Sequence, residues 1–208
     1  MSRSRISKWG VPGVVPAPAA GPPWAGSVGA PAGRGVAPIA ADQITVAELS
    51  AGDWPEAARI YEAGIASGNA TLEPRAPGWE EFSSGREGCP ALVARDSRGA
   101  VLGWAALSRS SADDVYRGVG IVSIYVDPMV SRRGVGSRLL GELIEASERA
   151  GFWTVEAGIF PENIASINLH KRLGFRLVGT RRHFGRMPDG RWRDELLYER
   201  RSLVVGYD

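Results

Sequence analysis

The sequence has few of the residues that build metal sites and disulfides. Cys89, the single cysteine, has no internal partner for a disulfide, so nothing in the 208 residues indicates an oxidising compartment. The two histidines, His170 and His183, form no Cys/His cluster, and we expect no metal. No apolar run approaches the ~20 residues of a membrane-spanning helix. We therefore expect a cytoplasmic protein without a membrane partner.

Charge and proline are unevenly distributed. The formal net charge is +2, too small to predict binding to nucleic acid. Residues 1–41 carry four basic and no acidic residues, so the remainder carries 2 − 4 = −2. Half of the 14 prolines also lie in this segment, which buries too little apolar surface to offset its ordering entropy. We expect 1–41 to be a disordered Pro/Gly/Ala-rich tail and 42–208 to be one folded domain.

Hydrophobic periodicity in 42–208 predicts strands and helices in alternation. The order is strand, helix, three strands, helix, strand, helix and two strands, which is typical of a three-layer α/β or α+β domain. Asp53 is the expected N-cap of the first helix, with Glu56 three residues later. The expected strands are 43–49, 91–94, 101–107, 120–126, 152–159, 175–181 and 192–200, and the expected helices are 54–66, 136–150 and 163–173.

A basic, glycine-containing loop joins the strand at 120–126 to the next helix. Residues 124–137 read Ile-Tyr-Val-Asp-Pro-Met-Val-Ser-Arg-Arg-Gly-Val-Gly-Ser. Glycines let a ligand approach the backbone, and a helix start offers unpaired N–H groups, so the segment predicts a phosphate or pyrophosphate site. Neither a P-loop nor the Gly-x-Gly-x-x-Gly fingerprint is present. A plain glycine-rich turn is the alternative for this segment alone.

A second segment, 162–175, reads Glu-Asn-Ile-Ala-Ser-Ile-Asn-Leu-His-Lys-Arg-Leu-Gly-Phe. Together the two segments resemble the GNAT superfamily, with its Gln/Arg-x-x-Gly-x-Gly/Ala loop and Asn-x-x-Ala/Ser-x-x-x-Tyr/His-x-x-x-Gly-Phe helix. Ser-Ile-Tyr-Val at 123–126 and Gly-Arg-Trp-x-Asp at 190–194 are similar to its phosphinothricin and methionine sulfoximine acetyltransferase branch. The resemblance covers 43–203 and implies the GNAT three-layer fold, a mixed central sheet flanked by helices.

The resemblance also implies an acetyl-CoA site. The amide of Val126 would polarise the thioester carbonyl, and Asn163 would hydrogen-bond the cofactor near its thiol end, act as an N-cap, or do both. Ser131 replaces the usual Gln or Arg, so we expect a weaker contact at one point without loss of binding. The pantetheine arm would pair with the backbone of Ile124, Tyr125 and Val126, and the pyrophosphate with the amides of Arg132, Arg133, Gly134, Val135, Gly136 and Ser137.

Two positions bear on catalysis. His170 stands where the family places a Tyr or His near the sulfur, which makes it the candidate general acid; a helix-face histidine without a role is the alternative. The branch usually has Glu where this chain has Ile121. Another group, water, or a substrate amine of low pKa must then replace the base. Glu73 and Asp114 are the candidate substitutes.

Three residues are the predicted substrate contacts: Glu73, Tyr116 and Arg117. Arg117 could bind a substrate carboxylate through two hydrogen bonds, and a solvated loop arginine is the alternative. The sequence thus predicts an N-acetyltransferase that moves the acetyl group of acetyl-CoA to the primary amine of a small molecule, with an amino acid or analogue as the candidate acceptor. A longer acyl donor, a protein N-terminus as acceptor, and a non-catalytic CoA sensor stay open. A homodimer is consistent with the resemblance.

Overall fold

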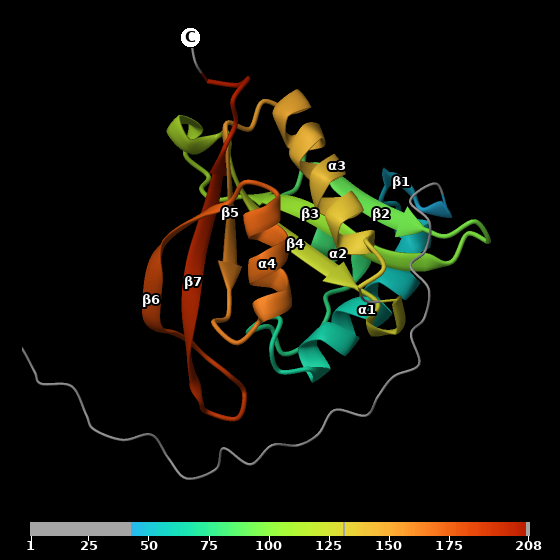
Figure 1. Cartoon of the computed structure of the whole chain (residues 1–208), viewed down its shortest axis with the longest axis horizontal. Coiled ribbons are helices and arrows are strands. Elements are labelled where there is room, and N and C mark those ends of the chain that lie inside the picture. Colours follow the sequence, from blue (N-terminus) through green and yellow to red (C-terminus); the bar gives the residue numbers. More distant parts are fainter. Residues whose placement is uncertain (1–42, 131, 207–208) are drawn as a thin grey trace, which may run out of the picture. The chain divides into compact units, whose positions relative to one another are not determined.

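The computed structural model describes residues 43–130 and 132–206, which form one mixed seven-stranded sheet with helices on both faces (Figure 1). The strand order is β1-β2-β3-β4-β5-β7-β6. Each neighbouring pair is antiparallel except β4 and β5, which are parallel. No helix in the described ranges is long and apolar enough to cross a membrane. The predicted tail at 1–41 lies outside the described residues and stays a prediction.

The predicted order of strands and helices is confirmed, and shorter elements are added to it. One five-residue helix, α2, and three 3₁₀ turns were not predicted, because such short segments leave no periodic pattern. The elements are β1 (Thr45–Glu48), η2 (Ala51–Asp53), α1 (Trp54–Ala66), α2 (Trp79–Ser83), β2 (Ala91–Arg95), β3 (Val101–Arg109), η3 (Asp114–Tyr116), β4 (Val119–Val126), η4 (Pro128–Val130), α3 (Val135–Arg149), β5 (Thr154–Ile159), α4 (Ile164–Arg172), β6 (Arg176–Arg186) and β7 (Trp192–Arg201).

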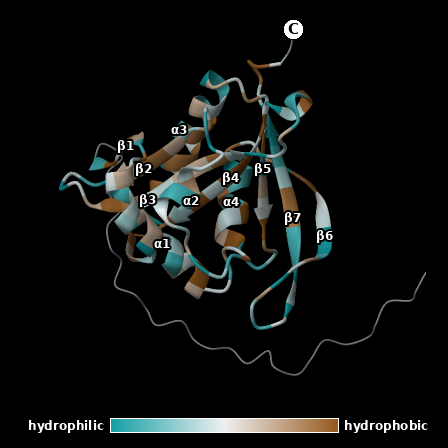
Figure 2. Ribbon diagram, turned by 180° about the vertical axis from the view of Figure 1, so that it is seen from behind, coloured by the Kyte–Doolittle hydropathy of each residue, from teal (hydrophilic) through white to brown (hydrophobic). Residues whose placement is uncertain are grey.

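Alternation along β3 divides the core into two layers. Ala105 and Leu107 pack on the side of α3 and α4, whereas Trp104 and Ala106 pack on the side of α1 and α2. This is the period of two that a strand buried on both faces requires. Figure 2 shows the hydrophobic residues along α3 and the central strands, and more hydrophilic stretches on the outer β6–β7 hairpin.

The start of α1 differs from the prediction. Asp53 has helical backbone angles and does not cap α1; its carboxylate instead accepts hydrogen bonds from the amide (3.0 Å) and hydroxyl (2.7 Å) of Ser50. A 3₁₀ turn precedes α1, so the capping residue moves three positions back, to Ser50. Asp53 also pairs with Arg95 of β2, and these hydrogen bonds lower its pKa even though burial alone would raise it. The carboxylate therefore ties the helix start to the sheet.

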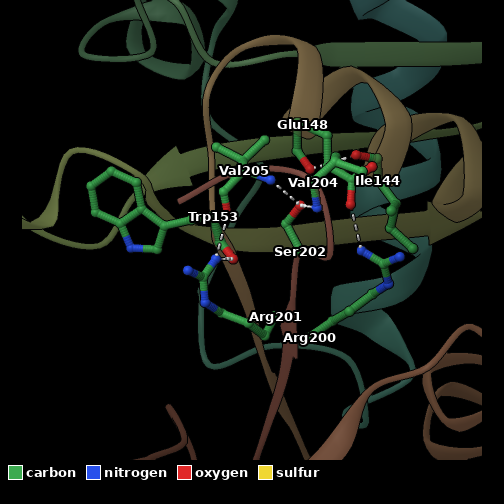
Figure 3. A network of polar contacts seen from close by, with 9 residues as sticks. Ile144, Glu148, Trp153, Arg200, Arg201, Ser202, Val204 and Val205 are labelled. Atoms are coloured by element: carbon green, nitrogen blue, oxygen red, sulfur yellow. Dashed lines mark hydrogen bonds and ion pairs between the residues drawn. The ribbon is translucent and has the colours of Figure 1, made fainter. Parts of the chain in front are cut away.

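The C-terminal end of β7 is held against α3 and β5 (Figure 3). Arg200 donates to the carboxylate of Glu148 at 3.0 Å, which links β7 to α3. The amide of Ser202 donates to the carbonyl of Trp153, and Arg201 donates to the same carbonyl. These contacts fix one end of the β5–β7 pair.

The parallel β4–β5 pair opens into a wedge. Its paired register runs only from Val119 to Ile121 on β4 and from Thr154 to Glu156 on β5. β4 continues to Val126, paired with β3 from Gly120 onward, while β5 diverges from it (Figure 1). Within the described residues, the last five residues of β4 thus present a strand edge that no neighbouring strand occupies.

Candidate active site

A cavity of about 940 Å³ lies in the wedge between β4 and β5. The open part of β4, the start of α3, the end of β5 and one face of α4 enclose it on one side. The end of α1 and the loop that follows it close the other side. Of the residues predicted from sequence, the cavity is lined by Ile124, Tyr125, Val126, Arg132, Gly134, Val135, Gly136, Ser137, Asn163, His170 and Glu73.

The loop before α3 has the geometry of an anion site. Gly134 has φ +86° immediately before the helix, a conformation that glycine adopts without strain. The first intrahelical bond runs from the amide of Arg138 to the carbonyl of Gly134, at 3.0 Å. The amides of 135–137 therefore have no partner in the helical ladder and lie at the positive end of the helix dipole. The residues that carry them line the cavity. Arg132, also at positive φ (65°), lines the cavity, whereas Arg133 does not.

An ion pair braces the end of β4. Asp127 is buried and accepts from Arg59 of α1 at 2.5 Å and from the amide of Met129 at 2.9 Å. Burial would raise the pKa of Asp127, but these hydrogen bonds outweigh it and lower that pKa. The amide of Asp127 also donates to the carbonyl of Leu102. The brace holds the strand end from which the glycine-containing loop before α3 departs.

His170 is 1% exposed, on α4, and has one engaged ring nitrogen. Its Nδ1 lies 2.9 Å from the carbonyl oxygen of Ser166, which can only accept, so Nδ1 carries the proton. Nε2 is buried and has no hydrogen-bond partner among the described residues. Burial lowers the pKa of His170, and the bond to Ser166 offsets this only in part. The ring is therefore neutral near pH 7, with an unprotonated Nε2, and His170 is one of the residues that line the larger cavity.

Asn163 is the N-cap of α4, as one of its two predicted roles required. Its Oδ1 accepts from the amide of Ser166 at 3.1 Å, and its Nδ2 donates to the carbonyl of Asn69 at 3.0 Å. The contact between Asn163 and the cofactor stays a prediction. Both polar atoms of the Asn163 side chain already have partners. A hydrogen bond to the cofactor would therefore be made by an atom that also bonds to Ser166 or Asn69.

Arg193, which sequence reasoning missed, holds the loop after α1 in place. It is buried on β7, with its guanidinium 3.9 Å from the Phe160 ring centroid. It donates to the carbonyl of Gly68 at 2.7 Å and to Glu162 at 3.0 Å. The loop that closes the cavity is thereby tied to β7 and to the connection before α4.

A second cavity, of about 280 Å³, adjoins the first, and Glu73 and Ser123 line both. Its apolar wall includes Phe82 and Trp104. Arg86 also lines it, with its guanidinium 4.4 Å from the Phe82 ring centroid. The Nε of Arg86 is buried and has no hydrogen-bond partner in the described chain, and burial lowers the pKa of the group. A partly buried cation with one buried, unpaired donor beside an apolar wall favours an anionic ligand.

The structure does not bring all predicted substrate residues to these cavities. Tyr116 and Arg117 lie in and beside the exposed turn η3, and the Arg117 guanidinium is 5.8 Å from the ring centroid of Trp153. Neither residue, nor Asp114, lines either cavity. Their roles stay predictions. Ile121 lines the larger cavity, on the face of the sheet that carries Tyr125.

These features fit acetyl-CoA. An open strand edge suits the amide groups of a pantetheine arm, unpaired helix amides suit a pyrophosphate, and the cavity runs between them. His170, whose Nε2 has no hydrogen-bond partner in the described chain, lines the same cavity. In the described part of the chain, no group of three or more His, Cys, Asp or Glu side chains is placed to hold a metal ion.

Comparisons with known proteins agree with this geometry. The chain is 39% identical over 109 residues to the L-methionine sulfoximine/L-methionine sulfone acetyltransferase of Pseudomonas aeruginosa, covering 52% of this chain and 63% of the relative. It is 40% identical over 100 residues to the phosphinothricin N-acetyltransferase of Streptomyces coelicolor, covering 48% and 58%. The matches thus span less than two thirds of either relative's length.

A solved structure extends the likeness. The phosphinothricin acetyltransferase of Sinorhizobium meliloti in complex with acetyl-CoA superposes with a TM-score of 0.70 at 34% identity, covering 76% of this chain and 88% of that one. The model of the acetyltransferase (GNAT) family matches residues 53–175, more than half of the chain. The chain therefore belongs to the GNAT acetyltransferase family.

Proposed function

We propose that this protein is an N-acetyltransferase that moves the acetyl group of acetyl-CoA to the primary amine of a small, amino-acid-like molecule. One observation carries the proposal: the open edge of β4 and the unpaired amides at the start of α3 line the same cavity. The relatives are named as acetyltransferases of amino-acid analogues, and these names support an amino-acid-like acceptor.

The donor would lie along β4 and end at α3. The backbone of 124–126 would bind the pantetheine arm, and the amides of 134–137 would bind the pyrophosphate, with Arg132 adding charge. Preorganised amide donors stabilise negative charge that develops on an oxygen, and the Val126 amide would act in this way on the thioester carbonyl.

The acceptor would enter from the smaller cavity. Its carboxylate would pair with Arg86, and its side chain would contact Phe82 and Trp104. The residues shared by the two cavities, Glu73 and Ser123, would then flank the amine. Holding amine and thioester together in this way converts a bimolecular encounter into a unimolecular one.

His170 keeps its proposed role as general acid, with one added requirement. Its Nδ1 proton is committed to Ser166, so Nε2 must first take up a proton before it can donate one to the leaving thiolate. A cytoplasmic location and a homodimer remain expectations that follow from the sequence and its resemblance.

Thermal denaturation with acetyl-CoA, CoA and NAD tests the donor site first. A ligand at ~100 times its Kd stabilises by about 2.7 kcal/mol, which raises Tm by a few degrees in a domain of this size. We expect a rise with both CoA forms and none with NAD. Thiol release should follow with amino acids and should be slower with amines that lack a carboxylate. Binding of CoA without turnover across the acceptor panel would instead favour a sensor, and transfer to a peptide N-terminus alone would favour a protein acceptor.

A further inference from the structure

We propose that Glu195 of β7 is the general base that removes a proton from the acceptor's ammonium group. The assignment rests on the proposed function, and it supplies the base that Ile121 does not provide. Glu195 lines the larger cavity together with the open part of β4, although β7 is two strands away from β4 in the sheet.

The register of the sheet places Glu195 on the acceptor side. Gly158 of β5 pairs with Leu197 of β7, and Ile159 pairs with Leu196. Leu196 packs against the core beneath α3 and α4, so the neighbouring Glu195 faces the opposite side, toward α1 and its following loop. The smaller cavity, lined by Phe82 of α2, opens on that side.

A missing side chain on β5 makes room for the carboxylate. A Cβ added at Gly158 would lie 2.2 Å from Oε1 of Glu195 and 2.5 Å from its Cδ, so the carboxyl group lies across the position where a residue other than glycine would project. β4 and β5 diverge beyond the pair of Ile121 and Glu156; Ser123, two residues further along β4, lines both cavities, and Gly158 lines the larger one together with Glu195. The carboxylate therefore lies where the acceptor amine must meet the donor.

One oxygen of the carboxylate is held and the other is available. Oε2 accepts from Arg181 of β6 at 2.9 Å, while Oε1 has no hydrogen-bond partner among the described residues. The side chain is only 15% exposed, and burial raises the pKa of Glu195 despite the opposing effect of Arg181. A base whose pKa moves toward the working pH transfers protons more effectively.

The proton balance of the step is simple. The ammonium gives one proton to Oε1 of Glu195, which later returns it to solvent, and the nitrogen lone pair becomes free. That pair forms the C–N bond, the C–S bond breaks, and the electron pair leaves on sulfur. The nitrogen loses its second proton and the thiolate gains one, so that amide and thiol are the products.

Other carboxylates on this side of the molecule are less well placed. Glu73 lines both cavities, but it belongs to an exposed loop where water hydrates it. Glu156 neighbours Ile121 in the β4–β5 register, yet it lines neither cavity. Glu156 is therefore a matched control: a carboxylate on the same face of the sheet, one strand away.

The test compares Glu195→Gln with Glu156→Gln and Glu73→Gln in the full chain, using the best amino-acid acceptor from the panel. For Glu195→Gln we expect kcat/KM at pH 7 to fall by about 10²–10⁴-fold. The loss should shrink as the pH rises toward the pKa of the acceptor amine, where free amine becomes abundant. The acetyl-CoA Kd and Tm should match the wild type, and Glu156→Gln should keep its activity.

The outcomes separate the two proposals. If Glu195→Gln keeps the wild-type kcat/KM, or if its kcat/KM falls by the same factor at every pH, the assignment of Glu195 is overturned. The proposed acetyltransferase function then still stands. The assignment is also overturned if kcat/KM falls further in Glu73→Gln than in Glu195→Gln and does so in a pH-dependent way. Absence of turnover by the wild type with every acceptor overturns both.

Discussion

Nδ1 of His170 lies 2.9 Å from the carbonyl oxygen of Ser166, one turn earlier on α4. The bond fixes the tautomer, so Nε2 carries no proton; this atom is buried, in a residue that lines the larger cavity. Replacing His170 with Phe keeps an aromatic ring beside Phe175, where the two ring centroids are 4.9 Å apart in an edge-on contact. We expect kcat to fall by about 10²-fold or more with little change in the acetyl-CoA Kd. Full activity of His170→Phe would remove the general acid from the proposal.

The same burial predicts a pH dependence of stability. His170 has a folded pKa below its ordinary 6.5, so the unfolded chain binds its proton more readily. Its contribution to stability is full above pH 6.5 and declines as the pH falls from there toward the lowered folded pKa. The free energy of unfolding, measured by urea denaturation, should fall less between pH 7.5 and pH 5.5 in His170→Gln than in the wild type. The control is His183→Asn at the exposed histidine, in which this free energy should fall as much as in the wild type.

Arg86 should determine whether the enzyme needs a carboxylate on its acceptor. Arg86 and the adjoining Phe82 line the smaller cavity, and the Nε of Arg86 has no hydrogen-bond partner in the described chain. Hydrogen bonds to a charged group are worth about 1.5–3 kcal/mol. Arg86→Gln should therefore raise KM for amino acids by about 10–150-fold. Decarboxylated analogues should show no such change.

Arg75→Gln is the matched control, because Arg75 lines the same cavity but already pairs with Glu81 at 3.1 Å. Steady-state kinetics of both variants with an amino acid and its amine analogue would decide the role. An equal KM increase for both acceptors would show that Arg86 acts on the shape of the cavity and not on the carboxylate.

Local patterns were enough to predict most of the fold and most residues of the loop that lines the larger cavity. The stripe of Leu139, Leu140, Leu143 and Ile144 is buried on α3, as its helical spacing required. The start of α3 and the open edge of β4 meet because they are consecutive in the chain, so the sequence of 124–137 contains both halves of the site. The resemblance then supplied the cofactor.

The acceptor side could not be predicted in the same way. Arg86 and Glu195 are separated by more than a hundred residues, and they line two adjoining cavities that share Glu73 and Ser123. Their significance comes from burial and from missing partners, which no short motif encodes. Arg117 was selected by resemblance, yet in the structure its guanidinium lies near Trp153. Gly158 gave no signal, because its role is to leave space for a side chain on another strand.

The brace between Arg59 and Asp127 should couple stability to cofactor binding. Asp127→Asn weakens the pair at a buried carboxylate whose partner is half exposed, so we expect a loss of about 1–3 kcal/mol in unfolding free energy. Acetyl-CoA should also bind more weakly, because Asp127 fixes the end of β4. Glu56→Gln alters the other, exposed partner of Arg59 and should change neither property measurably. Calorimetric titration with acetyl-CoA and urea denaturation measure the two effects separately.

The glycines of the α3 region offer a pair of substitutions with opposite expected signs. Gly134 has φ +86° at the helix start, and a side chain in that left-handed conformation costs roughly 1–2 kcal/mol. Gly134→Ala should thus destabilise the protein and weaken acetyl-CoA binding, since relaxing the strain rotates the amides that face the cavity. Gly141 lies within the same helix with no atom near its added Cβ, so Gly141→Ala should stabilise the protein by about 0.5–1 kcal/mol. Its acetyl-CoA Kd should match the wild type. If Gly134→Ala loses stability but binds acetyl-CoA normally, the loop is a turn and the pyrophosphate contacts lie elsewhere.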